Sequence, residues 1–278
     1  MPQQLTPTPE MNISYNSDAF MPNEPIEHYH PAYELVFFQT AHINIFVKNK
    51  TLPIRDGDCL FINEFELHKV LYTPNTQYTR YVINFKKEYL QELLHLLQAD
   101  DLLSLVESSG YAHLHCKLKQ RADMEQYFRQ LYDKHQHLQT AMDAASVKNT
   151  LIALLIHFYE LYRQAAPTLP LNKTDRQVQA IIEYIDTNYN EAITLDLLQE
   201  KTFISKYHIA HLFRHLTGFS VIEYTQYRRI IEAQKLLRDT SQTVTEICYA
   251  CGFNSIQHFC RVFKKFSHTT PAKYRRLT

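Results

Sequence analysis

Glycine is scarce in this chain of 278 residues, which contains only Gly57, Gly110, Gly218 and Gly252. Neither of the common phosphate-binding motifs, G-x-G-x-x-G and G-x-x-x-x-G-K, can be written with glycines at these positions. A glycine-rich loop that holds the phosphates of a nucleotide is therefore excluded. Common nucleotide-dependent reactions are disfavoured as well, and no cofactor is expected.

Long apolar runs are also missing. No stretch of about 18 apolar residues occurs, so no membrane-spanning helix is expected. The first residues, MPQQLTPTPEMN, lack the basic and apolar regions of a secretory signal. The cysteines are sparse and odd in number, which is typical of reduced thiols, so we expect a cytoplasmic location. They are Cys59, Cys116, Cys248, Cys251 and Cys260.

The formal net charge is zero, but the charges are unevenly distributed. Residues 173–278 carry 15 basic and 10 acidic side chains, whereas residues 1–172 carry 14 and 19. A basic part joined to an acidic part suggests that only the C-terminal part meets a polyanion. The length and a hydrophobic content of 45% are sufficient for two folded domains.

The segment from about residue 14 to residue 85 has the pattern of short β-strands. Residues 33–38 are rich in strand-forming side chains, and apolar residues alternate along 43–47. Turn-forming residues at 48–50 and 56–58 separate the strands. Several short strands at this spacing predict a small barrel or a sandwich.

The segment 86–163 has the spacing of helices instead. One helix carries an apolar stripe at intervals of four and three residues over two heptads. The stripe consists of Val147, Leu151, Leu154, Phe158 and Leu161. It fits either a helix packed on its own barrel or a dimerisation helix. The next stretch, QAAPTLPLNK at 164–173, holds two prolines and few large apolar residues, so we expect a linker there.

The chain from Thr174 onwards is predicted to be helical, and it contains an internal duplication. Three capping boxes mark helix starts, at Thr174…Gln177, Ser220…Glu223 and Thr243…Glu246. Residues 195–199 match 244–248 at an offset of 49, and residues 209–214 match 259–264 at an offset of 50. Each copy predicts a short helix, a tight turn and a longer helix, at about 195–216 and 244–266.

The turns of the two copies support this interpretation. Ser205 is expected to cap the second helix of the first copy, and Asn254 or Ser255 that of the second. Gly252 supplies a turn position where positive φ is required. This is the arrangement of a helix-turn-helix motif, whose second helix enters the major groove of DNA.

These residues resemble the AraC/XylS family of transcription regulators. The resemblance covers about residues 178–276 and is carried by LDLLQEKTFISKYHIAHLFRHLTG at 195–218, VTEICYACGFNSIQHFCRVFKKF at 244–266 and TPAKYR at 270–275. It implies an α+β protein of two domains. A cupin-like β-barrel with following helices would occupy 1–163, a linker 164–173, and an all-α DNA-binding domain 174–278.

The resemblance also implies which side chains bind DNA. The base-reading set is Tyr207, Ala210, His211, Ile256, Gln257, His258 and Arg261, and the phosphate-binding set is Lys206, Arg214, Lys264, Lys265 and Arg276. Glutamine suits adenine and arginine suits guanine, because each makes bidentate hydrogen bonds to that base. The core set is Leu198, Leu212, Phe213, Ile247, Phe259, Val262 and Phe263. Gln199 and Gln257 depart from the alanine and serine that are common in the family.

Two groups of residues are of types that can bind a metal, but each also has an interpretation without a metal. Cys248, Cys251, His258 and Cys260 suggest zinc, but the first pair falls on an apolar helical face, so buried thiols are expected instead. His28, His30, Glu34 and His68 have the order and spacing of the cupin metal motif. The companion motif is incomplete, because Asn63 and Phe65 replace its usual proline and glycine. These four residues are interpreted as a metal site, as part of an effector pocket or as structural residues, and no metal is predicted.

The sequence predicts a sequence-specific transcription regulator rather than an enzyme. The expected partners are double-stranded promoter DNA, a small-molecule effector, RNA polymerase and a second copy of the chain, and the family favours activation. A sugar effector would suit the aromatic residues Tyr15, Phe20, Tyr29, Tyr33 and Phe37. The alternatives are a metal-dependent cupin enzyme fused to a DNA-binding module, and an adaptor that has lost DNA binding.

Overall fold

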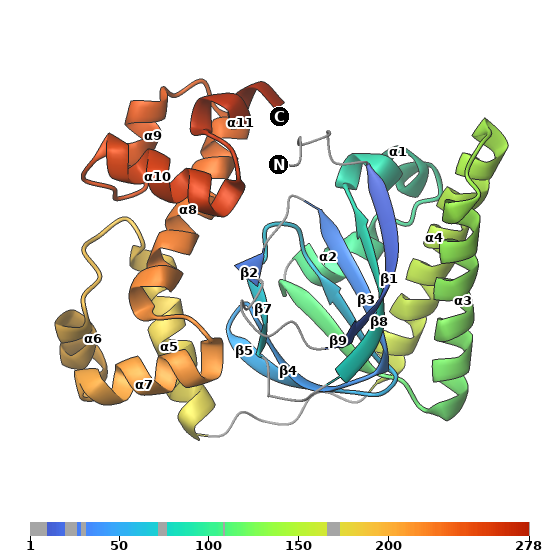
Figure 1. The fold of residues 1–278 in the computed structure, drawn as a ribbon, viewed down its shortest axis with the longest axis horizontal. Coiled ribbons are helices and arrows are strands. Elements are labelled where there is room, and N and C mark those ends of the chain that lie inside the picture. The colour runs from blue at the N-terminus through green and yellow to red at the C-terminus, as the bar shows by residue number, and fades with distance from the viewer. Residues whose placement is uncertain are drawn as a thin grey trace. The chain divides into compact units, whose positions relative to one another are not determined.

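The computed structural model of the chain has two compact units. It describes residues 10–19, 27–28, 32–71, 77–107, 109–165 and 173–277. The chain passes from the first unit to the second between Leu169 and Pro170, apart from Asn49–Thr51, which is grouped with the second. The first unit contains sheets and helices and the second is helical, so the fold is α+β (Figure 1). Most of the expected linker, 164–173, lies outside the described residues.

The strands of the first unit form two sheets. The larger has the order β1-β8-β3-β6-β9 and the smaller the order β2-β7-β4-β5. The strands are β1 (Met11–Ala19), β2 (Glu27–His28), β3 (Tyr33–Thr40), β4 (His42–Val47), β5 (Lys50–Arg55), β6 (Asp58–Ile62), β7 (His68–Leu71), β8 (Gln77–Phe85) and β9 (Tyr111–His115). Within the larger sheet, β3 lies antiparallel between β6 and β8.

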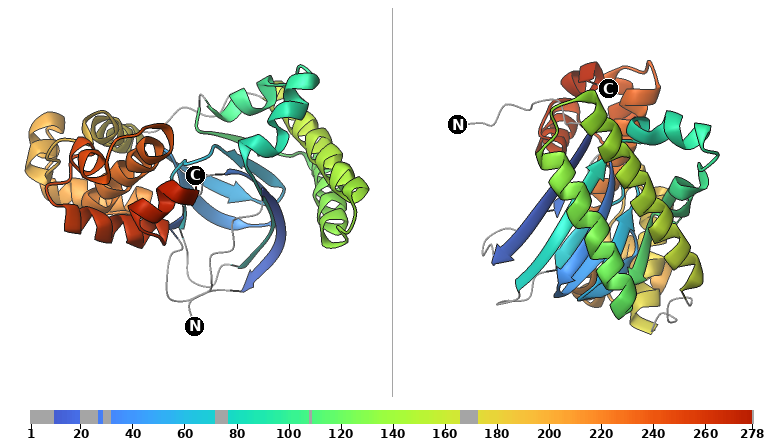
Figure 2. Two further views of the ribbon diagram at one scale, coloured as in Figure 1. Left: turned by 90° about the horizontal axis from the view of Figure 1, so that it is seen from above. Right: turned by 90° about the vertical axis from the view of Figure 1, so that its right-hand side faces the viewer.

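Successive side chains of a strand point to opposite faces of its sheet, which gives the larger sheet two different surfaces. Leu35 and Phe37 of β3 belong to one core cluster, together with buried residues of the helices. Val36 and Phe38 belong to a second cluster, which includes Ile45 of β4 in the other sheet. The first unit therefore has three layers: the smaller sheet, the larger sheet and a layer of helices (Figure 2).

The helical layer of the first unit consists of α1 (Lys87–Leu96), α2 (Asp101–Glu107), α3 (Leu118–Gln136) and α4 (Ala141–Gln164). The apolar stripe of α4 is buried in the core of this unit, with Val147, Leu151 and Leu154 fully inaccessible. Packing on the barrel of the same chain is thus confirmed for the stripe. The interpretation of these residues as a dimer seam is wrong, because they face their own sheet.

The segment 86–163 is not wholly helical, as the pattern suggested, because β9 lies within it. β9 pairs with β6 at the edge of the larger sheet, and Asp58 of β6 lies beside two of its histidines. Asp58 accepts hydrogen bonds from His113 Nε2 at 2.9 Å and His115 Nδ1 at 2.5 Å. Burial raises the pKa of the Asp58 carboxyl, but these bonds and the Arg55 amide outweigh burial and lower it. The buried Asp58 carboxylate thus stabilises the pairing of the edge strand β9 with β6.

The second unit contains α5 (Lys173–Asn188), α6 (Leu195–Thr202), α7 (Lys206–Thr217), α8 (Val221–Asp239), α9 (Val244–Ala250), α10 (Ile256–Ser267) and α11 (Pro271–Leu277). The pairs α6–α7 and α9–α10 match the two predicted helix-turn-helix copies, and α8 connects them (Figure 1). Within the described parts of the chain, no helix is long and apolar enough to cross a membrane.

Most of the expected helix caps are confirmed. Ser205 accepts a hydrogen bond from the amide of His208, and Ser255 from the amide of His258, so each caps its helix. The capping boxes that begin at Ser220 and Thr243 are both formed. The prediction for Thr174 is wrong, because α5 begins at Lys173 and Thr174 lies inside its first turn.

Gly252 lies at a turn that requires a residue without a side chain. Its φ is 80°, and a Cβ atom placed there would lie 2.3 Å from the carbonyl oxygen of Asn190. The Asn190 loop is itself fixed, since Arg229 donates to the carbonyl oxygens of Tyr189 and Glu191, both at 2.6 Å. The close backbone contact between Gly252 and Asn190 therefore positions the second helix-turn-helix, and neither segment can move away to make room for a side chain.

We expect Gly252→Ala to lower the free energy of unfolding of the second unit by about 2 kcal/mol or more, because it adds left-handed strain to a steric clash. Thermal or urea unfolding of the full chain measures the change. Ala250→Ser, at an exposed position two residues earlier, is the matched control and should stay within about 0.5 kcal/mol of the parent. Equal stability of the glycine variant would contradict the close contact.

Candidate functional site

Helices α7 and α10 each bury one face and expose the other. Their buried residues are Ile209, Leu212, Phe213 and Thr217 in α7 and Phe259, Val262 and Phe263 in α10. The predicted core residues of both copies, including Leu198 and Ile247 on the bracing helices, are confirmed as buried. Since 3.6 residues complete a turn, the side chains between these positions face solvent.

The exposed faces of the two helices correspond at an offset of 50 residues. Tyr207 corresponds to Gln257, His211 to Arg261 and Arg214 to Lys264, and all six side chains are exposed. Positions separated by four and then three residues lie along one side of a helix. Each helix therefore presents a row of polar or aromatic side chains that the core does not use.

Hydrogen bonds orient the exposed row of α10. Arg261 Nη2 donates to His258 Nδ1 at 3.0 Å, which places the guanidinium beside the first turn of the helix. The Ser255 hydroxyl donates to Gln257 Oε1 at 3.3 Å. In α7 the rings of His211 and His215 stack, with centroids 6.2 Å apart. Of the remaining predicted base-reading residues, Ala210 and Ile256 are half-buried.

The predicted phosphate-binding cations differ in their surroundings. Lys206 Nζ lies 2.8 Å from Asp196 Oδ1, and Arg214 Nη1 lies 4.0 Å from Glu223 Oε2. Lys264, Lys265 and Arg276 are exposed, and Lys265 lies over the ring of Phe266. Exposed ion pairs contribute at most about 1 kcal/mol, so neither pairing holds its cation firmly in place.

Residues of α8 and of the closing segment 270–275 hold the helices together. Tyr224 Oη donates to Asp186 Oδ1 at 3.1 Å, and Arg228 Nε lies 2.7 Å from the same oxygen. The ring of Tyr274 packs edge-on against Phe263, and Arg275 donates to the carbonyl oxygen of Leu237 at the end of α8. These residues therefore position the exposed rows and do not belong to them.

The cysteines of the second repeat lie inside the protein. Cys248 and Cys251 are fully buried, and burial raises the pKa of the Cys251 thiol to about 12 and that of Cys248 as well. The side chains therefore fill the core at the turn.

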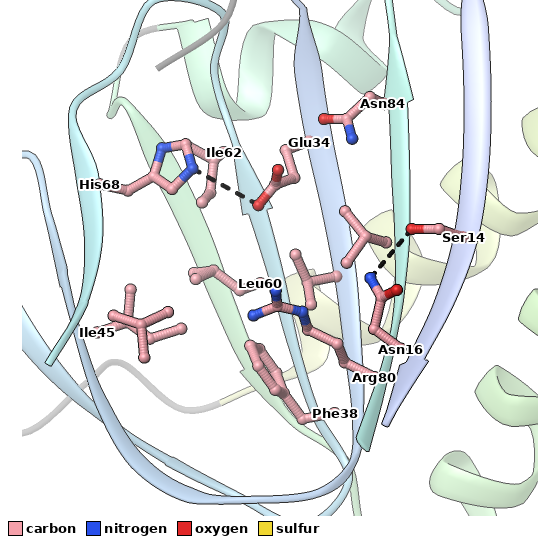
Figure 3. Close-up of a pocket in the computed structure, with 13 residues that line it drawn as sticks. Ser14, Asn16, Glu34, Phe38, Ile45, Leu60, Ile62, His68, Arg80 and Asn84 are labelled. Atoms are coloured by element: carbon pink, nitrogen blue, oxygen red, sulfur yellow. Dashed lines mark hydrogen bonds and ion pairs between the residues drawn. The ribbon is translucent and has the colours of Figure 1, made fainter. Parts of the chain in front are cut away.

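A cavity of about 220 Å³ lies in the first unit between the two sheets. Its lining follows from strand alternation, since Glu34, Val36 and Phe38 point inward from β3, and Arg80, Val82 and Asn84 from β8. The other lining residues are Ser14, Asn16, Ile45, Leu60, Ile62, His68 and Val70 (Figure 3). The walls are thus largely apolar, with polar groups at separate points.

The polar groups of the cavity come from both sheets. Glu34 Oε1 lies 3.6 Å from His68 Nε2 (Figure 3). His68 Nδ1 also donates to the carbonyl oxygen of Glu66 at 2.9 Å. Arg80 Nη1 donates to the hydroxyl of Tyr78 at 3.0 Å. Asn84 Oδ1 is buried and has no hydrogen-bond partner among the described residues. A small polar molecule would find donors and acceptors on three sides.

The predicted four-residue set is only partly brought together. Glu34 and His68 face each other across the cavity, and His28 of β2 lies opposite His68 in the strand register. The side chain of His28 is not described, and His30 lies outside the described residues. Among the side chains that are described, no three of the types His, Cys, Asp and Glu are grouped to hold a metal.

Sequence reasoning missed several residues of the cavity. Ser14, Asn16, Arg80 and Asn84 were not singled out, although polar residues on the inward positions of an apolar strand were the available signal. Of the aromatic residues taken as sugar-stacking candidates, Tyr33 and Phe37 lie in the opposite core cluster, and Phe38 lines the cavity instead. Tyr15 is exposed beside Tyr81, whereas Phe20 and Tyr29 lie outside the described residues.

Comparison with known proteins assigns a domain type to each unit. Residues 21–154 match the AraC-like ligand binding domain, and residues 198–277 match a helix-turn-helix domain. The chain is 26% identical over 250 residues to the HTH-type transcriptional activator RhaS of Salmonella paratyphi A, which covers 90% of this chain and 87% of RhaS. The RhaS protein of Salmonella arizonae gives the same identity and coverage.

Among solved structures, a probable AraC family transcriptional regulator from Rhodopseudomonas palustris is 30% identical over 36% of this chain and 95% of its own, with a TM-score of 0.35. The two family domains follow each other in this order in the chain, one on the sheet-rich unit and one on the helical unit. The chain therefore belongs to the AraC/XylS family and is a DNA-binding transcription regulator with a ligand-binding domain.

Proposed function

We propose that the chain activates transcription by placing α7 and α10 in successive major-groove faces of promoter DNA. The observation that carries the proposal is the pair of exposed rows at an offset of 50 residues, each on a helix whose other face is buried. Recognition helices of this type lie about one helical turn of DNA apart when they bind one site. One chain would thus read an asymmetric sequence.

The proposed roles of the side chains follow from their chemistry. Arg261 would bind guanine and Gln257 adenine, with His211, Tyr207, Ala210, Ile256 and His258 completing the base-reading surface. Lys206, Arg214, Lys264, Lys265 and Arg276 would bind phosphates, which sets affinity and its salt dependence without reading the sequence. His258 accepts a hydrogen bond from Arg261, so it would also hold the guanidinium in place.

The cavity of the first unit is the proposed effector site. Its volume of about 220 Å³ lies below the ~300–1,000 Å³ of drug-sized pockets, so the effector would be a small metabolite. Separate polar groups between apolar walls, with Phe38 among them, suit a carbohydrate. Binding would shift the population of DNA-binding states with a coupling of about 1–3 kcal/mol.

The regulator would act in the cytoplasm as a homodimer that contacts RNA polymerase and has no catalytic activity of its own. The alternative, a metal-dependent enzyme fused to a DNA-binding module, requires His28, His30, Glu34 and His68 to share a metal ion. Elemental analysis of purified protein separates the two. Stoichiometric iron, manganese or nickel that is lost in His68→Ala would support the enzyme and overturn the proposal.

We expect Arg261→Ala to weaken binding to DNA selected from a random duplex pool by about 1–3 kcal/mol, and to relax the preference for guanine at one position. Lys264→Ala, one turn further along the same face, should weaken binding to all sequences alike and reduce the salt dependence by about one phosphate contact. Fluorescence anisotropy titrations of the full chain at several salt concentrations measure both effects.

These two variants are controls for each other. Both positions are exposed, so neither change should alter the melting temperature by more than the effect of an ordinary surface substitution. If Arg261→Ala binds every sequence as tightly and as selectively as the parent chain, α10 does not read bases.

We expect a metabolite screen to identify a compound that raises the melting temperature of the full chain, and Asn84→Leu to reduce that shift. The substitution removes the buried acceptor Asn84 Oδ1, which lines the cavity. Loss of one hydrogen bond of this kind weakens binding of the compound about tenfold. Asn44→Leu, at an exposed position of β4, is the matched control and should keep the full shift. An unchanged shift in Asn84→Leu would place the effector elsewhere.

A further inference from the structure

Phe203 combines high exposure with a disfavoured backbone conformation. Its side chain is 95% exposed, the largest value for a large hydrophobic residue in the described part of the chain. It ends α6 with φ 56° and ψ 25°, which is the left-handed region. Residues other than glycine are disfavoured in this region. Asparagine, aspartate and histidine adopt it more often than other residues, and phenylalanine is not one of these types.

Neither packing nor the turn itself explains this phenylalanine. Phe65 adopts a similar φ of 57°, but it is buried, so its ring is anchored in a core. In the second repeat the left-handed position of the turn is filled by Gly252, and the apolar side chain that packs inward is the next residue, Phe253. In the first repeat Phe203 stands at the position of the glycine, and Ile204, which is half-buried, follows it.

Phe203 lies in the turn that leads directly into α7, which carries the first exposed row. Two residues later Ser205 caps α7, and Tyr207 in the first turn of that helix is 81% exposed. The first residues of a recognition helix are those that reach base edges. Two exposed aromatic side chains therefore lie at the end of α7 that enters the groove.

We propose that Phe203 contacts the C5-methyl group of a thymine and extends the base-reading surface of α7 beyond its first turn. The thymine methyl is the apolar group that base pairs present in the major groove, and phenylalanine is one of the side chains that bind it. The occupant is DNA rather than a protein because Phe203 directly precedes α7 in the chain, and the sequence around it carries two lysines, Lys201 and Lys206, that suit flanking phosphates. The inference rests on the proposed DNA contacts of α7.

The first test replaces the side chain with residues that suit the turn. Phe203→Asn and Phe203→Gly both fit a left-handed turn, so the melting temperature should stay the same or rise. Affinity of the full chain for its selected DNA should fall about tenfold, which corresponds to about 1.4 kcal/mol. Leu96→Asn, at an exposed leucine of α1 in the first unit, is the control and should change neither quantity.

The second test removes the methyl group from the DNA. Each thymine of the selected fragment is replaced in turn by deoxyuridine, which keeps every hydrogen bond. The parent chain should lose about fourfold in affinity at one position, the value of a buried methyl group. This sensitivity should vanish in Phe203→Asn and persist in Tyr207→Ala, because Tyr207 would contact a different base.

Two outcomes would overturn the inference. In one, Phe203→Asn binds DNA like the parent chain and keeps the same deoxyuridine sensitivities. In the other, it keeps its DNA affinity but fails to activate transcription, which would assign the ring to a protein partner. If His211→Ala and Arg261→Ala also leave DNA binding unchanged, then the proposed DNA contacts have failed and not only the role of Phe203.

Discussion

Burial of one face of each element is the constraint on which both units depend. In the helices α7 and α10, residues three and four apart form the core, and the side chains between them are left in solvent. In the strands β3 and β8, successive side chains alternate between the two faces of the sheet. One set packs against the helices and the other lines the cavity. On the helices, the exposed rows are the side chains that the core does not use, whereas in the sheet unit core residues such as Val36 and Phe38 also line the cavity.

The two repeats share a fold but not a chemistry. Arg261, Lys264 and Lys265 give α10 fixed positive charges, whereas the corresponding positions of α7 are His211, Arg214 and His215. Under the proposed contacts, these cations would add to the phosphate contacts that dominate affinity for DNA, as would Lys206 and Arg214 of α7. The row of α7, with aromatic and imidazole side chains, suits recognition by shape and apolar contact. Under the proposed contacts, the two copies would therefore read different groups on the bases.

The sequence predicted the helical unit better than the sheet unit. Helix caps, the 3.6-residue period and the repeat are local signals, so the second helices at Ser205 and Ser255 could be placed closely. β9 was missed because an edge strand needs a partner distant in sequence, and the Asp58 contacts that fasten it have no local pattern. The cavity was predicted only in part, because Arg80 and Asn84 line it only once the two sheets face each other, and the sequence does not show that packing.

Guanine N7 methylation interference with the full chain tests the central claim most directly. Two clusters of interfering guanines, about one helical turn or ten base pairs apart, are predicted for each bound chain. Arg261→Ala should remove interference in one cluster and leave the other intact, because each helix contacts its own groove segment. A single cluster, or the simultaneous loss of both, would contradict the account of two separate reading helices.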